Sequence, residues 1–129
     1  MADHLVVFVT CPTKRIAHRL TRALLERRLV ACVNILPSVE SLFWWEGRID
    51  KASEFLLLIK TRRSCFEALR QTVCRLHPYE TPEVIALPII LAHRPYVEWI
   101  QQSLAMPASG ARLPLRRRHQ GRKFSENRS

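Results

Sequence analysis

The order of apolar and polar positions predicts alternating strands and helices along residues 5–104. A continuous apolar run, Leu5-Val6-Val7-Phe8-Val9, is typical of a central strand that is buried on both faces. Pro12 ends this strand, and Thr13 is suited to cap a helix that continues to about Arg28. The apolar residues of that helix recur at helical spacing, and they are Ile16, Leu20, Ala23 and Leu24.

The next two extended stretches predict one long β-hairpin. The first covers residues 30–45, and Pro37 within it predicts a bulge or a bend because proline cannot donate a ladder hydrogen bond. Glu46-Gly47-Arg48 supplies the turn, since glycine adopts positive φ without strain. The chain then returns as a second long strand over residues 49–60.

A second helix, a last strand and a short third helix complete the pattern. Ser64 is predicted to cap the second helix, with Glu67 three residues later as its capping-box partner. This helix should end at His77, because a proline follows and disfavours helical geometry before it. Residues 84–87 predict the last strand, and the apolar spacing over 96–104 predicts the third helix.

The predicted order, β-α-β-β-α-β followed by a helix, defines an α+β fold class. Two helix crossovers joined through a hairpin give a ferredoxin-like antiparallel sheet with two helices on one face, a long β-hairpin and a short C-terminal helix. The length fits one domain, which we assign to residues 1–106. Periodicity stops there, so residues 107–129 are predicted to form a basic, disordered tail.

The formal net charge of +10 is concentrated in this tail. Residues 105–129 hold seven basic residues and one acidic residue. The arginine cluster at 112–123 would bind phosphates through counterion release, but it has one nearby aromatic ring for stacking and no base-reading module. A nucleic-acid-associated protein is therefore an alternative, and a solvated terminus is the simpler interpretation.

Cysteine usage and the N-terminus bear on the compartment. The four cysteines form no Cys-x-x-Cys pair and are too sparse for a disulfide scaffold, which favours a reducing compartment. The first apolar run is too short for a signal peptide or a membrane span, and no basic segment precedes it. We therefore predict a cytoplasmic protein that does not contact a membrane.

Six short strings occur in order along residues 4–104 and carry a resemblance to a known family. They are Val9-Thr10-Cys11-Pro12, Leu29-Val30-Ala31-Cys32-Val33-Asn34-Ile35-Leu36-Pro37, Trp44-Trp45-Glu46-Gly47, Leu58-Ile59-Lys60-Thr61, His77-Pro78-Tyr79-Glu80-Thr81-Pro82-Glu83 and Ile85-Ala86-Leu87-Pro88. Together they resemble the CutA family, which is named for tolerance to divalent cations. The resemblance implies a ferredoxin-like fold in a compact homotrimer and an association with copper and other divalent metal ions.

The hairpin aromatics fit the implied trimer. Alternation places Phe43 and Trp45 on one face of the hairpin and Trp44 on the other. Burying one large side chain is worth about 2–3 kcal/mol, so a subunit interface is a natural place for these rings. We predict a trimer interface at Phe43, Trp44, Trp45, Tyr79 and Glu80. The alternative is that the aromatics cover the core of their own subunit.

The stiff segment from His77 to Glu83 is the candidate metal site. Imidazole and carboxylate together suit copper, zinc or nickel better than magnesium. Candidate ligands are His77, Glu83 and Cys11, and a second subunit would have to complete the site because a closed site takes four ligands. In some bacterial members of the family a strand cysteine and a second histidine are associated with copper. The matching positions here are Val9 and Leu76, so of that group only His77 is present.

The sequence contains none of the common catalytic motifs. No GxSxG, HExxH, P-loop or GxGxxG string is present, so we predict that the protein is not an enzyme. The resemblance to the CutA family implies a homotrimeric protein of divalent metal ion (copper) tolerance. One alternative is a trimeric small-molecule sensor of the P-II type with ligand clefts between subunits. The interpretation that competes with the metal site is structural: His77 ends a helix, and Tyr79 packs and forms a hydrogen bond.

Overall fold

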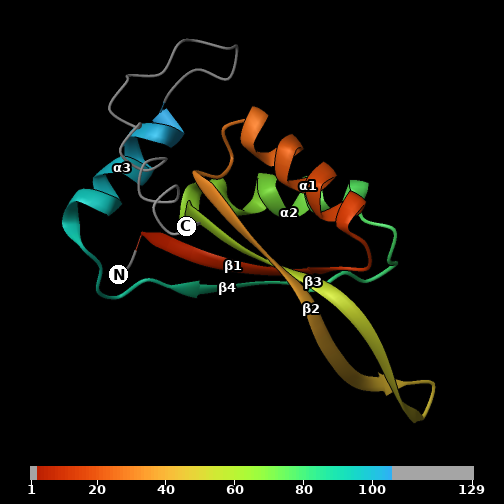
Figure 1. Cartoon of the computed structure of the whole chain (residues 1–129). Coiled ribbons are helices and arrows are strands. Elements are labelled where there is room, and N and C mark those ends of the chain that lie inside the picture. Colours follow the sequence, from red (N-terminus) through yellow and green to blue (C-terminus); the bar gives the residue numbers. More distant parts are fainter. Residues whose placement is uncertain (1–2, 106–129) are drawn as a thin grey trace, which may run out of the picture.

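The computed structural model describes residues 3–105, whose four strands form one antiparallel sheet in the order β2-β3-β1-β4 (Figure 1). The strands are β1 (His4–Cys11), β2 (Cys32–Trp45), β3 (Arg48–Arg62) and β4 (Val84–Pro88). The helices are α1 (Lys14–Glu26), α2 (Phe66–Leu76) and α3 (Arg94–Ala105), with a short 3-10 turn η1 (Arg63–Cys65) before α2. This order confirms the ferredoxin-like α+β fold. The predicted tail and its arginine cluster lie outside the described residues.

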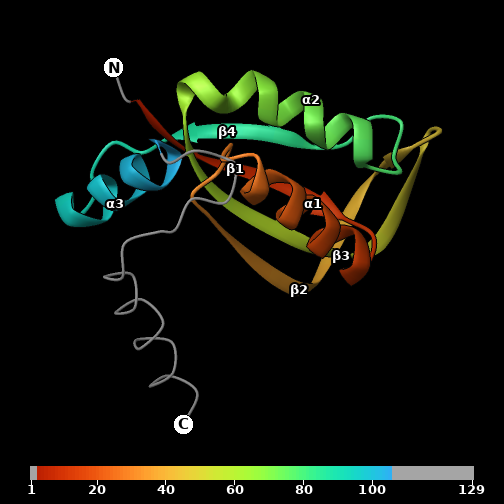
Figure 2. The same cartoon turned by 90° about the horizontal axis from the view of Figure 1, so that it is seen from above.

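Helices α1 and α2 lie side by side over one face of the sheet, and α3 lies at one end of the molecule (Figures 1 and 2). Apolar side chains of the two helices meet the sheet in a core whose fully buried members include Leu20, Leu24, Leu69, Val73, Val7, Val9, Leu57 and Ile59. Residues Ile100 and Leu104 of α3 pack with Ala31 in a smaller cluster. No helix within residues 3–105 is long and apolar enough to cross a membrane.

Within residues 3–105, no helix or strand covers the other face of the sheet. In β1, buried residues alternate with partly exposed ones up to Val9. Phe8 lies directly opposite Leu58 of β3 and Ile85 of β4, so these apolar side chains share the open face. The prediction of a central strand buried on both faces is therefore wrong for the isolated chain, because both helices cover the same side.

The hairpin of β2 and β3 extends past the helix layer, as Figure 1 shows. Its turn has two residues, Glu46 and Gly47, with φ values of 50° and 78°, which match a type I′ turn. The pairing of β2 with β3 shifts register at Pro37 and Ser38, which confirms the predicted bulge.

The two helix starts differ in how well they were predicted. Thr13 caps α1, since its hydroxyl accepts a hydrogen bond of 3.1 Å from the backbone N–H three residues later. Ser64 was predicted to cap α2, and this is wrong because residues 63–65 form a 3-10 turn that leads straight into the helix. Glu67, the predicted capping-box partner, instead accepts hydrogen bonds from the guanidinium of Arg70.

Candidate functional site

The loop of residues 77–83, between α2 and β4, is tied to the sheet by His77. This side chain is only 7% exposed. Its Nδ1 accepts a hydrogen bond of 3.1 Å from the backbone N–H of Tyr79, so Nε2 carries the proton and donates to the carbonyl oxygen of Thr10 at 2.7 Å. Both ring nitrogens are therefore engaged in holding the loop against the end of β1.

Tyr79 ties the same loop to β3. Its hydroxyl donates a hydrogen bond of 2.7 Å to Oε2 of Glu54, a carboxylate that is only 6% exposed. Burial and then this carboxylate raise the pKa of Tyr79 to about 12, so the phenol stays protonated and continues to donate. Burial, with a smaller effect of Glu54, also raises the pKa of the Cys11 thiol to about 12.

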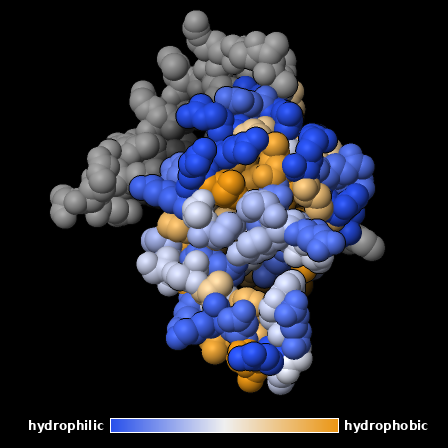
Figure 3. Space-filling model, turned by 90° about the vertical axis from the view of Figure 1, so that its right-hand side faces the viewer, coloured by the Kyte–Doolittle hydropathy of each residue, from blue (hydrophilic) through white to orange (hydrophobic). Residues whose placement is uncertain are grey.

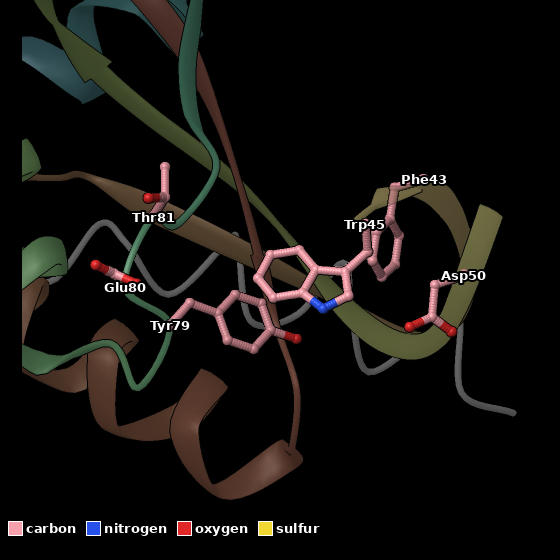
Figure 4. Close-up of a pocket in the computed structure, with 6 residues that line it drawn as sticks. All are labelled: Phe43, Trp45, Asp50, Tyr79, Glu80 and Thr81. Atoms are coloured by element: carbon pink, nitrogen blue, oxygen red, sulfur yellow. The ribbon is translucent and has the colours of Figure 1, made fainter. Parts of the chain in front are cut away.

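A hollow of about 400 Å³ separates the hairpin from this loop. The hairpin contributes Phe43, Trp45 and Asp50 to its walls, and the loop contributes Tyr79, Glu80 and Thr81. In the view of Figure 4 the indole of Trp45 lies between the rings of Tyr79 and Phe43. The hollow therefore has aromatic walls with carboxylates beside them, and no lysine or arginine among residues 3–105 lines it.

The structure brings together four of the five residues that we predicted for an interface. Phe43, Trp45, Tyr79 and Glu80 all line the hollow, whereas Trp44 lies on the opposite face of the hairpin and is 73% exposed. The alternation that placed these aromatic side chains on two faces is thus confirmed by the strand register. Their place in a trimer interface stays a prediction.

The three candidate metal ligands are in different environments. Both nitrogens of His77 are engaged, the thiol of Cys11 is fully buried and protonated, and Glu83 is exposed. Metal ions bind the thiolate and a free imidazole nitrogen, so these groups as arranged in one chain do not fit a metal ion. Among residues 3–105, no group of three or more histidine, cysteine, aspartate or glutamate side chains is arranged to hold one. Copper ligation by these residues stays a prediction.

Two acidic residues of this region were missed by the sequence reasoning. Glu54 directly precedes the apolar run at 55–59, and a carboxylate beside a buried strand was a signal that it needs a partner. Asp50 lies directly opposite Phe43 in the hairpin, a pairing that a two-residue turn at Glu46 and Gly47 dictates. Counting outward from the turn would have found it.

The sheet order, the two helices on one face and the projecting aromatic hairpin define a ferredoxin-like α+β domain with an elaborated β2–β3 hairpin. The chain belongs to the family of CutA1 divalent ion tolerance proteins, whose model matches residues 5–103. The resemblance that the six strings carry is therefore confirmed.

Individual relatives agree with this assignment. The chain is 44% identical over 108 residues to Protein CutA of Mus musculus, covering 83% of this chain and 61% of that protein. It is 42% identical over 98 residues to the divalent-cation tolerance protein CutA of Thermus thermophilus, covering 76% of this chain and 95% of that one. The chain thus spans just over half the length of mammalian relatives such as human Protein CutA, at 53%, and nearly all of the bacterial one.

Solved structures of CutA1 proteins have the same fold as this chain. The crystal structure of CutA1 from Oryza sativa matches with a TM-score of 0.77 at 45% identity, covering 79% of this chain and 94% of that one. The divalent cation tolerance protein from Thermus thermophilus matches with a TM-score of 0.76 at 41% identity, covering 78% of this chain and 97% of that one.

Proposed function

We propose that this chain works as a homotrimer in divalent-cation tolerance and that it is not a conventional enzyme. The family assignment supports the process, since its members are named for divalent ion tolerance. The observation that carries the assembly is the uncovered apolar face of the sheet. The four free cysteines suit the reducing cytoplasm, which is where we propose that the protein acts.

The open sheet face has the composition of a buried surface. Phe8 and Leu58 lie at its centre, and Ile85 and Leu87 beside them are about half exposed. Monomeric proteins rarely leave contiguous apolar patches of this kind in water. A second covering layer from other copies of the chain explains why β1 and β3 carry continuous apolar runs although the helices protect only one side.

The hairpin also exposes apolar side chains that an assembly would bury. Leu42, Trp44 and Ile49 are exposed on one of its faces, while Phe43 and Trp45 occupy the other. Figure 3 shows hydrophobic surface among hydrophilic residues at the lower end of the molecule, where the hairpin projects. Strands β2 and β4 are the two different edges of the sheet, so joining one edge to the other edge of the next copy gives a ring when the rotation between copies closes. The family resemblance makes that ring a trimer.

Sedimentation equilibrium tests the assembly. We expect the wild type to have the mass of three chains at micromolar concentration, and Ile85→Lys to dissociate because it places a charge on the open face. Ile85 is 52% exposed in the single chain, so the fold itself should tolerate lysine there. Leu25→Lys on α1, also an exposed leucine, is the matched control and should stay trimeric. A wild-type monomer would refute the proposal.

Copper is the divalent ion that we propose for His77, Glu83 and Cys11, in a site that a second subunit would have to complete, because these groups do not fit a metal ion as they lie in one chain. Support comes from the contact of the His77 ring with the carbonyl of Thr10, which places the ring beside the residue that precedes Cys11. Binding there has to replace a hydrogen bond of the ring and to remove the thiol proton, so affinity should increase with pH.

The copper proposal is tested by titrating Cu²⁺ into the wild type, His77→Ala and Glu83→Gln at two pH values. Weaker binding by both variants supports it, and equal affinities remove these residues as ligands. Circular dichroism checks that His77→Ala is folded, and Glu83→Gln provides a second test because Glu83 is exposed. The exposed Cys74 is changed to serine in every protein, so that adventitious binding there does not contribute.

A further inference from the structure

The hollow between the hairpin and the 77–83 loop has a chemistry that metal tolerance does not use. Its walls combine three aromatic rings, from Phe43, Trp45 and Tyr79, with the carboxylate of Asp50, and no basic side chain of residues 3–105 lines it. We infer that it binds a small organic cation with an alkylated ammonium head. This inference rests on the geometry of the single chain and does not depend on copper binding.

The aromatic walls supply the first attraction. The face of an aromatic ring carries negative electrostatic potential, and alkylammonium ions are bound by cages of such rings. In the single chain Trp45 is 59% exposed, so its indole is open to a ligand there, and Figure 4 shows it flanked by Tyr79 and Phe43. Each ring contact is worth between about twofold and thirtyfold in affinity, depending on how completely water is excluded.

Two carboxylates supply the second attraction. Glu54 is more than nine-tenths buried, and the hydrogen bond that it accepts comes from the neutral hydroxyl of Tyr79, which lines the hollow. A buried carboxylate is costly without a positive charge nearby, and a cation bound against Tyr79 would provide one. Asp50 lies on the hairpin wall, and one of its oxygens is held by the backbone N–H of Lys51 at 2.8 Å. The carboxylate of Glu80 is turned away from Trp45 in Figure 4, so it does not belong to the carboxylates that attract the cation.

The size of the hollow agrees with a small ligand. A hollow of about 400 Å³ is at the small end of the usual range of ligand sites. The chain as a whole carries a formal charge of +10, so its surface does not attract cations in general. The net charge of the chain therefore does not by itself favour cation binding.

The experiment compares choline with 3,3-dimethylbutan-1-ol, which has the same shape without the charge, by isothermal titration calorimetry on the full chain. We expect choline to bind saturably, one per chain, and at least about tenfold more tightly than the alcohol. Equal affinities, or no saturable binding of choline, would overturn the inference.

Variants locate the site. Trp45→Leu and Glu54→Gln should each weaken choline binding by about tenfold or more, because the first removes one ring of the wall and the second removes one of the two carboxylates. Trp44→Leu is the matched control on the opposite hairpin face and should leave the affinity unchanged within about twofold. Equal losses in Trp44→Leu and Trp45→Leu would contradict the assignment.

A basic side chain from a neighbouring copy has the same chemistry as the proposed ligand. Choline is therefore also titrated into Ile85→Lys, the variant designed to dissociate. Binding to this variant together with absence of binding to the wild-type assembly would show that a neighbouring copy fills the hollow, and would overturn the inference. Sedimentation equilibrium on the same samples reports the assembly separately, so failure of one proposal does not obscure the other.

Discussion

Replacing Tyr79 by phenylalanine should change how the stability of the protein depends on alkaline pH. The phenol donates to the buried carboxylate of Glu54 at 2.7 Å, and burial with this bond raises its pKa from the ordinary 10 to about 12. A raised pKa means that the folded state favours the protonated phenol. The resulting stabilisation is fully present below pH 10 and is lost as the pH approaches 12.

The size of the effect follows from these two pKa values. With pKa values of 10 unfolded and about 12 folded, linkage gives a loss of about 1.4 kcal/mol between pH 8 and pH 11. The ring is partly exposed, so solvent screening reduces this to about 0.7–1.4 kcal/mol. At pH 7 the variant should also be less stable by about 1–2 kcal/mol, because the hydrogen bond to a charged, buried group is lost.

Two measurements check this prediction. Urea unfolding of wild type and Tyr79→Phe at fixed chain concentration gives the two stability curves, and the wild type should fall more steeply above pH 9. The chain has two tyrosines, so the difference in phenolate absorbance between the two proteins reports Tyr79 alone. Tyr96→Phe is the control that leaves Tyr79 to titrate. Titration of Tyr79 near pH 10 in the folded protein, with parallel stability curves, would refute the reasoning.

Two further predictions concern a helix cap and the thiols. Thr13→Ala should destabilise the protein by about 1 kcal/mol in urea unfolding, because the N–H of Ile16 loses its acceptor. Thr13→Ser should retain most of the stability. An equal loss of stability in both variants would contradict the capping role. Under native conditions a thiol reagent should modify the exposed Cys74 long before Cys11, which is buried and protonated. Mass spectrometry identifies the modified cysteines. Early modification of Cys11 would contradict its buried position.

Sequence patterns predicted the hairpin well because its determinants are local. Gly47 permits the positive φ of the turn, and Pro37 forces the bulge within its own strand. The cap at Ser64 failed for an equally local reason, since a 3-10 turn and a capping box are alternative starts for the same helix. The pattern does not distinguish the two, because both begin with the same residues.

The candidate site was only half predictable because its polar contacts join distant parts of the chain. Alternation placed the hairpin aromatics correctly on two faces. Glu54 meets Tyr79 across 25 residues, however, and His77 meets Thr10 across 67. No spacing rule reports such pairs, so the burial of Glu54 and the engagement of both His77 nitrogens appear only once the loop is placed against the sheet.

The same loop links the two proposals for this protein. The backbone N–H of Tyr79 binds Nδ1 of His77, and the ring of Tyr79 forms a wall of the hollow. Copper bound through Nδ1 would have to displace that N–H, and losing this contact would loosen the hold on the loop that carries Tyr79. By reciprocity of linkage, choline should then weaken copper binding by the same factor by which copper weakens choline binding. Copper titrations with and without saturating choline measure this factor, and an unchanged copper affinity would show that the ion does not use Nδ1 of His77.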